Sequence, residues 1–192
     1  VTPSRNAHAY IDRTILSVIS QEGNFYIRYH VQDGGSGDGT VNALSRWQEM
    51  LNSGSYPIHC KGVYFSYTSE PDRGMYDAIA KGFSHMLIPP TAAMTWINAD
   101  DILMPGALAT VHKSFAQLPQ LSWLIGRGCT FGSNGELRGQ HVFAYPRKVL
   151  EKGLCDGKHW HFVQQEGTFW RKELWDKAGG LDCSFKYAGD WD

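Results

Sequence analysis

The chain has no large excess of charge of one sign and no long apolar runs. Its 18 basic and 19 acidic side chains give a formal net charge of -1 over 192 residues. Proteins that bind nucleic acid neutralise phosphates with surplus Lys and Arg, so nucleic acid is not expected as the main partner. A bilayer-spanning helix needs about 20 apolar residues. The apolar patch at residues 86–88 stops at Pro89 and Pro90, and the sequence predicts no transmembrane segment.

Cysteine is scarce and scattered. Its four positions contain no C-x-x-C pair: Cys60, Cys129, Cys155 and Cys183. Such residues are typical of small buried apolar groups rather than a disulfide framework, which favours a cytosolic compartment. No basic-then-apolar signal peptide is visible. Because the sequence starts at Val1 and ends at Asp192 inside an interrupted motif, we expect a fragment.

The length and the 42% apolar content predict one folded domain with a sizeable core. Helical spacing of apolar residues predicts helices at residues 11–20, 41–51, 75–83 and 103–115. Segments rich in β-branched and aromatic residues predict strands at residues 26–32, 62–66, 93–98 and 121–126. This alternation favours an α/β sheet covered on both faces. Ligands bind at the carboxyl ends of strands in such sheets, where the loops at residues 33–40 and 98–101 are expected.

The loop at residues 33–40 has four glycines directly after a predicted strand. Glycine allows close approach of the backbone to a ligand, and Thr40 is placed to cap the following helix. The loop fits neither G-x-x-x-x-G-K-[ST] nor G-x-G-x-x-G, nor an EF-hand. Two interpretations stay open: a tight turn with a helix cap, or a ligand loop in which Asp33 accepts hydrogen bonds from a base or ribose.

Asp100 and Asp101 form an adjacent pair of carboxylates after an apolar strand and before a helix that Pro105 is expected to open. Like charges this close usually need a cation or a donor-rich ligand. Mg²⁺ and Mn²⁺ prefer carboxylate oxygens and bridge them to substrate phosphates. The alternative is a charge cluster that favours the helix N-terminus.

Taken in order, these motifs resemble family 2 glycosyltransferases of the GT-A fold. Residues 31–40 resemble V-x-D-G-x-S-x-D-G-T, and residues 69–82 resemble S-E-x-D-x-G-x-Y-D-A-x-N-K-G, with Ala80 in place of the Asn. The remaining matches are the first strand and loop, the D-x-D-type metal motif and the acceptor-side end: residues 1–6, 98–101, 167–171, 179–182 and 189–192. The segment at residues 85–92 departs from the family pattern.

The resemblance implies a set of site residues. For the nucleotide-sugar donor these are Thr2 and Pro3 lining the nucleotide pocket, Asp33 on the base, Asp72 and Arg73 over the nucleotide or its diphosphate, and Asp100 near the ribose. Asp101 would bind the cofactor Mn²⁺ or Mg²⁺. Asp190 would be the base that deprotonates the acceptor, with Asp192 as its competitor. Acceptor contacts are expected at Gln165, Trp170 and Trp191.

The implied protein is a single α/β domain at residues 1–192 with the GT-A (Rossmann-like) fold, a mixed sheet sandwiched between helices. Its donor half would span about residues 1–101, and its acceptor half residues 102–192, truncated at the C-terminus.

The implied function is that of an inverting, metal-dependent hexosyltransferase. It would move a sugar from a nucleotide-diphosphate sugar, with a UDP-sugar favoured, to a hydroxyl of a saccharide or lipid-linked acceptor. By analogy with the family, the product is a bacterial cell-surface polysaccharide. The expected location is the cytoplasm, with association at the inner face of the membrane left open. The rival hypotheses are a non-catalytic nucleotide-sugar-binding domain of the same fold and a sugar nucleotidyltransferase.

Overall fold

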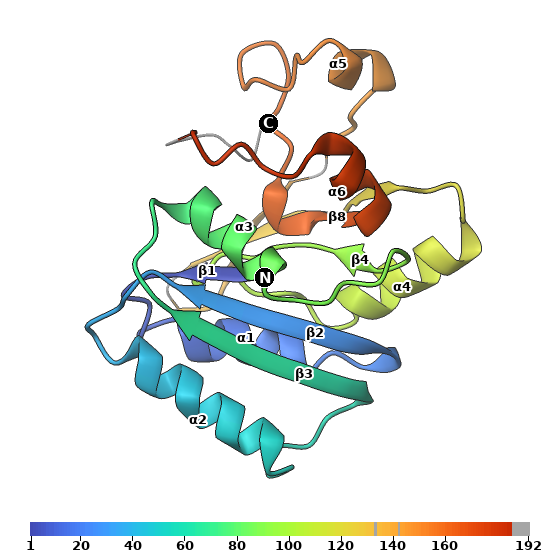
Figure 1. Ribbon diagram of the computed structural model, residues 1–192. Coiled ribbons are helices and arrows are strands. Elements are labelled where there is room, and N and C mark those ends of the chain that lie inside the picture. Colours follow the sequence, from blue (N-terminus) through green and yellow to red (C-terminus); the bar gives the residue numbers. More distant parts are fainter. Residues whose placement is uncertain (133, 142, 186–192) are drawn as a thin grey trace.

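The computed structural model describes residues 1–132, 134–141 and 143–185 (Figure 1). Its main sheet holds three parallel strands in the order β1 (Thr2–Ser4), β2 (Gly23–Asp33) and β3 (Cys60–Ser69). Ser4 pairs with Asp33, and Asp33 pairs with Ser69. The three strands therefore end in register, at one edge where three loops leave the sheet together.

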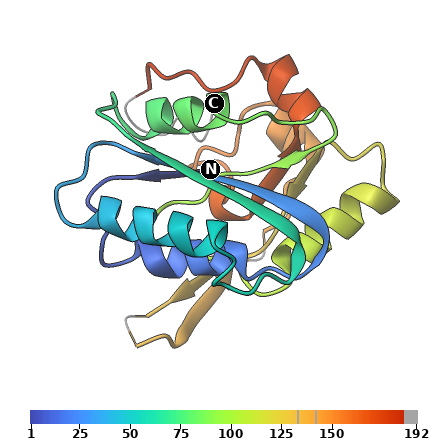
Figure 2. The same cartoon turned by 60° about the horizontal axis from the view of Figure 1, so that its bottom comes forward.

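Helices cover both faces of this sheet. Helices α1 (Ile11–Ile19) and α2 (Thr40–Asn52) lie on one face, and α3 (Met75–Ser84) lies on the other (Figure 2). The apolar residues of α1 recur three or four positions apart, so they form one stripe that faces the sheet. The first core consists chiefly of residues from α1, α2 and β2: Ile11, Ile15, Ile19, Ala43, Leu44, Ile27, Tyr29 and Val31.

A second sheet is antiparallel and brings distant segments together. It consists of β4 (Ala93–Met94), β8 (Thr168–Arg171) and β5 (Trp123–Ile125), with β8 in the middle. It shares an aromatic core with α3: Tyr76, Phe83, Trp96 and Trp170. Strand directions therefore differ between these two sheets: the first is parallel and the second is antiparallel.

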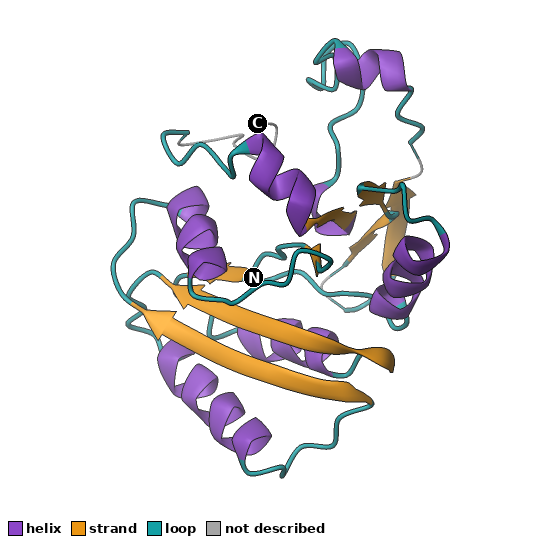
Figure 3. Ribbon diagram, turned by 45° about the vertical axis from the view of Figure 1, so that its right-hand side comes forward, coloured by secondary structure: helices purple, strands orange, loops and turns teal. Residues whose placement is uncertain are grey.

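The other elements lie around this second sheet. They are α4 (Ala107–Gln117), the hairpin β6 (Gly128–Phe131) and β7 (Leu137–His141), α5 (Arg147–Glu151), the 3₁₀ turn η1 (Gln165–Gly167) and α6 (Lys172–Ala178). Figure 3 shows the hairpin and the strands of the second sheet on the side of α4, apart from β2 and β3.

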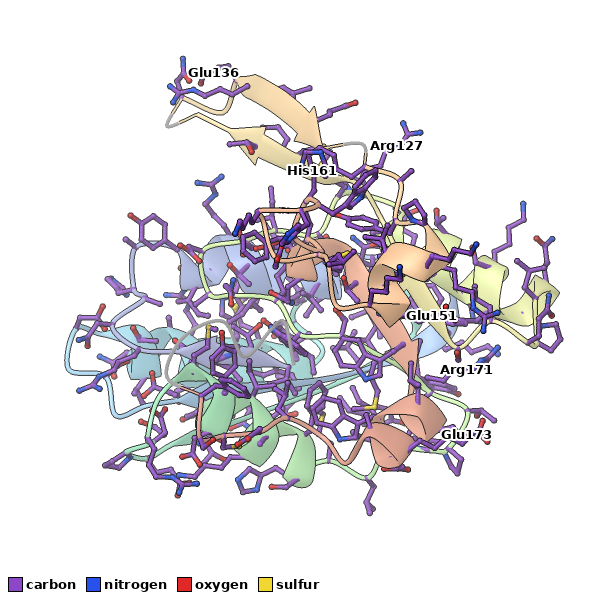
Figure 4. The ribbon with its side chains drawn as sticks, turned by 90° about the horizontal axis from the view of Figure 1, so that it is seen from above. Arg127, Glu136, Glu151, His161, Arg171 and Glu173 are labelled. Carbon is purple, nitrogen blue, oxygen red and sulfur yellow. The ribbon has the colours of Figure 1, made fainter. Side chains whose placement is uncertain are left out.

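Arg171 attaches α4 to the second sheet. Its guanidinium donates hydrogen bonds to the carbonyl oxygens of Leu121 and Phe115, at 2.7 and 2.8 Å, and lies 4.7 Å from the centre of the Phe115 ring. Figure 4 labels Arg171 at the end of β8, and labels Glu136 at the tip of the hairpin that projects from the molecule. Arg171 therefore has a structural role at the C-terminal end of α4.

The predicted strand at residues 93–98 is mostly wrong. Only Ala93 and Met94 form a strand, which pairs with β8. The following residues instead pair with the start of β1, because the Val1 amine donates to the Thr95 carbonyl (3.1 Å) and the Ile97 N–H donates to the Val1 carbonyl (2.9 Å). These two bonds follow the pattern of a parallel bridge. The chain therefore runs alongside β1 and delivers residues 98–101 to the edge where β1, β2 and β3 end.

The helix predicted from residue 103 begins later, at Ala107. Pro105 does not open it, because Pro105 and Gly106 form a turn in which Gly106 has a φ of +79°. That backbone conformation is left-handed and cannot continue into a right-handed helix. In the part of the chain that the structure describes, no helix is long and apolar enough to cross a membrane.

Candidate functional site

Asp33 ends β2 and organises the glycine loop that follows it. Its side chain is fully buried, and its Oδ2 accepts hydrogen bonds from the backbone N–H groups of Gly35 (3.1 Å) and Ser36 (2.9 Å). The Ser69 hydroxyl, at the end of β3, also donates to Oδ2 (2.7 Å), and the Ser36 hydroxyl donates to Oδ1. The carboxylate thus joins the ends of two strands to the loop. This arrangement gives Asp33 a structural role at the strand edge, and its predicted contact with a base stays a prediction.

We expect Asp33→Asn to destabilise the ligand-free fold by about 2–3 kcal/mol. The substitution replaces one carboxylate oxygen with an NH₂ group, which cannot accept the hydrogen bonds that this oxygen accepts in the wild type. Thermal unfolding without ligand should show a fall of roughly 5–10 °C. Glu49→Gln, on the exposed face of α2, is the control and should leave the melting temperature unchanged. An unchanged melting temperature for Asp33→Asn, together with lost nucleotide binding, would instead assign Asp33 to the ligand.

Asp38 anchors the other end of the same loop. Its Oδ1 accepts hydrogen bonds from the N–H (3.1 Å) and the hydroxyl of Thr40, and its Oδ2 accepts the His8 N–H (3.1 Å). Helix α2 begins at Thr40, after Gly39 with a φ of +97°. The predicted cap by Thr40 is therefore wrong. Asp38 satisfies the N–H at the helix start, and the Thr40 hydroxyl accepts the Ala7 N–H (2.9 Å).

The two predicted pocket residues of β1 lie in the sheet. Thr2 and Pro3 are both buried, and the Thr2 hydroxyl shares a hydrogen bond of 2.9 Å with the Tyr29 hydroxyl. Thr2 is therefore satisfied within the core, and any contact of Thr2 or Pro3 with a nucleotide stays a prediction.

Asp72 and Arg73 lie in the loop between β3 and α3. Arg73 donates to Oδ1 of Asp77 through Nη2 (2.8 Å) and Nε (3.2 Å), and its backbone N–H donates to Oδ2 (3.0 Å). Asp77 is 5% exposed, and the Arg73 guanidinium lowers its pKa. Arg73 therefore fixes the start of α3 while its side chain stays 78% exposed. Asp72, half-buried, lies beside it at the edge where the strands end.

The acidic loop is held in place by α1. The Thr14 hydroxyl contacts the carbonyl oxygens of Ala99 (2.7 Å) and Asp101 (2.8 Å), and the Asn98 amide donates to Oδ2 of Asp101 (3.1 Å). Asp100 is exposed, whereas Asp101 is partly buried. The structure thus gives the two adjacent carboxylates different surroundings.

Negative charge accumulates around Asp101. Burial is the main cause that raises the pKa of Asp101, to about 6; the neighbouring carboxylates of Glu166 and Asp100 also raise this pKa, and the hydrogen bond from Asn98 lowers it. No sequence motif pointed to Glu166, which lies 65 residues further along the chain, in η1. No described cation is paired with Asp101.

These residues fit a divalent cation that is shared with a substrate. Their oxygen ligands and unbalanced charge suit Mg²⁺ or Mn²⁺. Among the described residues, however, no group of three or more His, Cys, Asp or Glu side chains could hold a metal ion. An ion bound at Asp101 would therefore need further oxygens, such as those of a diphosphate.

The raised pKa of Asp101 predicts a pH dependence of the metal-free protein. A carboxyl that ionises near pH 6 when folded and near 3.8 when unfolded binds more protons in the folded state between these values. Stability from this group is therefore lost as pH rises toward 6. In EDTA, Asp101→Asn should melt with the wild type near pH 4 and about 2–4 °C above it at pH 7, after allowance for solvent screening. A difference that does not change with pH would contradict this prediction.

Gln165 and Trp170 are brought together by the second sheet. Both line a cavity of about 310 Å³, and the Gln165 amide donates to the Trp96 carbonyl at 2.5 Å. Trp170 is 6% exposed and lies 5.2 Å from Trp96 and 5.7 Å from Trp175 between ring centres. Trp96, which sequence reasoning missed, lines this cavity too. The indole N–H groups of Trp96 and Trp170 have no partner in the described part of the chain.

Another cavity lies away from this edge. A mostly apolar space of about 580 Å³ lies along the amino-terminal half of β2, between Tyr26, Ile27 and the segment at residues 86–95. Asp190 and Trp191, the predicted base and an acceptor contact, lie outside the described residues, as does Asp192.

Parallel strands with helices on both faces and loops gathered at their carboxyl ends define an α/β domain of the class that binds its ligands at that edge. Among solved structures, S. aureus TarS 1-349 matches 99% of this chain with a TM-score of 0.67, at 15% identity and over 51% of its own length. A second structure of TarS 1-349, in complex with UDP-GlcNAc, has the same TM-score at 13% identity and 50% of its length. The fold is thus of the GT-A type.

The sequence profile described as "Glycosyl transferase family 2" matches residues 1–178, and the chain belongs to this family. Curated relatives from Mycobacterium tuberculosis (strains CDC 1551 / Oshkosh and ATCC 25618 / H37Rv) are named uncharacterized glycosyltransferases. Both are 29% identical over 194 residues, which cover 99% of this chain. The chain spans 64% of the length of these relatives.

Proposed function

We propose that this domain transfers a hexose from a nucleotide-diphosphate sugar, with UDP as the favoured carrier, to a hydroxyl group with inversion. The acceptor would be a saccharide or a lipid-linked saccharide of a bacterial cell-surface polysaccharide. Transfer would take place in the cytoplasm, free or at the inner face of the membrane. The observation that carries this proposal is the half-buried Asp101 at the edge where the parallel strands end, close to the carboxylates of Asp100 and Glu166 and paired with no described cation. The TarS complex with UDP-GlcNAc supports the choice of UDP.

The difficult step in this chemistry is departure of a diphosphate from a sugar carbon. When bound, Mn²⁺ or Mg²⁺ would stabilise the charge on the departing diphosphate as a Lewis acid. Asp101 would hold that ion, Asn98 would orient the Asp101 carboxylate, and Thr14 would fix the backbone of the loop. Asp100, exposed beside them, would contact the ribose.

The acceptor side needs a base and a surface for the sugar. Asp190 would take the proton of the acceptor hydroxyl as the new bond forms. Gln165 and Trp170 would contact the acceptor from the cavity beside η1. Trp191, the residue after the proposed base, would also contact the acceptor. Glu166 places η1 close enough to Asp101 to raise its pKa, which supports an acceptor site next to the donor site.

Two rival functions are less well supported. A sugar nucleotidyltransferase would need a glycine-rich basic loop near its N-terminus, and residues 2–6 contain no glycine. A non-catalytic binding domain would keep the donor site without turnover. Transfer to an acceptor, measured separately from hydrolysis of the donor, distinguishes that domain from an enzyme.

The test is a thermal-shift panel of UDP, GDP, dTDP, CDP and ADP, each with Mn²⁺ and with EDTA. A ligand that binds only the folded state at one hundred times Kd stabilises it by about 2.7 kcal/mol, or roughly 5–10 °C here. We expect a shift with UDP that disappears in EDTA. A shift with another nucleoside diphosphate would replace UDP as the proposed carrier of the sugar. No shift with any of the five would overturn the proposal.

A further inference from the structure

Residues 143–163 form a lobe that stands out from the second sheet at the top of Figure 1. This α5 lobe contains α5 and the loop that leads from α5 into η1. Two hydrogen bonds close it. The Trp160 indole N–H donates to the Ala144 carbonyl (2.8 Å), and the Tyr145 hydroxyl donates to the Phe162 carbonyl (2.7 Å). The first and last segments of the lobe are therefore held side by side.

The α5 lobe leaves two large apolar side chains in solvent. It buries Cys155, whereas Trp160 is 38% exposed and Phe162 is 49% exposed. The Phe162 ring lies against Gly157, where an added Cβ would overlap the ring. The lobe thus holds both rings at the surface, and the position of the Phe162 ring requires a glycine at position 157. Neighbouring exposed apolar groups of this kind are typical of a contact surface.

Basic side chains accompany these rings. The lobe holds four of the chain's 18 basic residues and only two of its 19 acidic residues. Both acidic residues have partners, Glu151 in Arg147 (2.6 Å) and Asp156 in His159 (2.7 Å). The three lysines of the lobe are exposed and form no ion pair with a described residue: Lys148, Lys152 and Lys158. The lobe is therefore positively charged in a chain whose net charge is -1.

The surface of an anionic membrane matches this combination. Tryptophan is enriched where a bilayer meets water, because its ring is apolar and its N–H is polar. Lysines close to such a surface are attracted by anionic headgroups, and the two contributions to binding add. Lys148 and Lys152 are four positions apart and so share one face of α5. A neutral saccharide could stack on the rings, but it would leave the lysines without a counter-charge.

The α5 lobe leads directly to the proposed acceptor site. Phe162 is three residues before Gln165, and three extended residues span at most about 11 Å. Cys155 and Val163 of the lobe line the cavity of about 310 Å³ together with Gln165. A membrane that contacts the exposed rings would therefore lie close to this cavity, where a sugar attached to a lipid headgroup could reach it.

We propose that the α5 lobe docks on the surface of an anionic membrane, with Trp160 and Phe162 in the interface and the three lysines on anionic headgroups. The sugar acceptor is then a lipid-linked saccharide of that membrane and not a free saccharide. This choice of acceptor rests on the proposed function, because it assumes that Gln165 lies at the acceptor site. The docking itself does not rest on that function.

The first test is cosedimentation of the chain with vesicles of phosphatidylglycerol and phosphatidylcholine in equal parts, and with vesicles of phosphatidylcholine alone. We expect binding to the anionic vesicles only. This binding should be lost at about 1 M salt, where the Debye length falls to about 3 Å. Equal binding to both kinds of vesicle, or no binding to either, would overturn the proposal.

Charge variants show whether the lobe is the surface that binds. Each lysine near an anionic surface contributes a factor of about five, so removal of three should weaken binding about 100-fold. The variant combines Lys148→Gln, Lys152→Gln and Lys158→Gln. Its matched control makes the same change at three exposed lysines outside the lobe and should bind as the wild type does: Lys61→Gln, Lys113→Gln and Lys177→Gln. Equal losses in the variant and the control would overturn docking by the lobe.

Quenching by brominated phosphatidylcholine in the anionic vesicles locates the contact. Bromine in the bilayer quenches only tryptophans that lie at the membrane, so the wild type should be quenched. Trp160→Phe keeps an aromatic ring and should still bind, but it should lose most of the quenching. Quenching that survives in Trp160→Phe would show that another surface docks. Melting temperatures of the variants confirm that each is folded.

Two further measurements separate this inference from the proposed function. The thermal shift with UDP and Mn²⁺ tests the donor site without a membrane. A shift without vesicle binding would overturn the inference alone, whereas vesicle binding without a shift would overturn the proposed function and the choice of acceptor. Transfer of radiolabelled sugar from UDP-hexoses to a bacterial lipid extract in the anionic vesicles tests that choice. Label should enter the organic phase, less so in the lysine variant of the lobe, and label only in water-soluble saccharide would contradict a lipid-linked acceptor.

Discussion

Replacing Asp101 with Asn is expected to lower transfer by at least about 100-fold and to abolish the Mn²⁺ dependence of UDP binding. A neutral amide is a much weaker ligand for Mg²⁺ or Mn²⁺ than a carboxylate, and stabilising the charge of the leaving group contributes strongly to catalysis. The remaining acids nearby, Asp100 and Glu166, form with Asp101 no metal-holding group of three within the described ranges. They are therefore not expected to replace it.

The measurement is the rate of sugar transfer together with thermal shifts by UDP in Mn²⁺ and in EDTA. Because Asp101→Asn is also expected to stabilise the metal-free protein at pH 7, a loss of activity cannot be attributed to unfolding if its melting temperature is equal or higher. Glu49→Gln serves as the matched control, an acid-to-amide change on the exposed face of α2. A variant that keeps its Mn²⁺-dependent shift with UDP would remove Asp101 from the metal site.

Replacing Asp190 with Asn is expected to separate binding from transfer. Asp190 lies outside the described residues, and its role rests on the resemblance of residues 189–192 to the family motif. Loss of a general base lowers a rate by roughly 10²–10⁴-fold, whereas the donor site at Asp101 stays intact. We therefore expect an unchanged thermal shift with UDP and Mn²⁺, and transfer reduced by about that factor.

Asp192→Asn is the informative comparison for this variant, because it makes the same chemical change two residues away. Transfer that survives in Asp190→Asn and is lost in Asp192→Asn would move the base to position 192. A loss of UDP binding in Asp190→Asn would place the residue at the donor site instead of the acceptor site.

The sequence was informative about local structure where one face of an element is buried. The spacing of apolar residues at 11–20 predicted α1 (Ile11–Ile19) to within one residue, because residues three and four positions apart share a face. The strand predicted at residues 26–32 lies inside β2 (Gly23–Asp33). Local pattern was insufficient at residues 93–98, since apolar composition does not reveal which strand a segment pairs with. Pairing with β8 and with Val1 depends on segments that are distant in the sequence.

The candidate site, too, was predictable from the sequence only in part. Spacing and motif order pointed to Asp33, Asp72 and Asp101. Asp33 is the last residue of β2, and the other two lie in loops at or beside the strand edge. Their roles, however, depend on hydrogen bonds that no spacing contains. Ser69, 36 residues further along the chain, donates a hydrogen bond to Asp33, and the Asp72 carboxylate lies over the position of a side chain at Gly34.

By itself, therefore, the sequence determined the α/β class, the family and the loops that contain the chemistry, because periodicity and motif order are properties of the chain. Only the tertiary structure decided which carboxylate is hydrogen-bonded within its own loop and which lies near Glu166. The physical reason is that availability of a polar group depends on burial and on partners, and these partners come from distant parts of the chain.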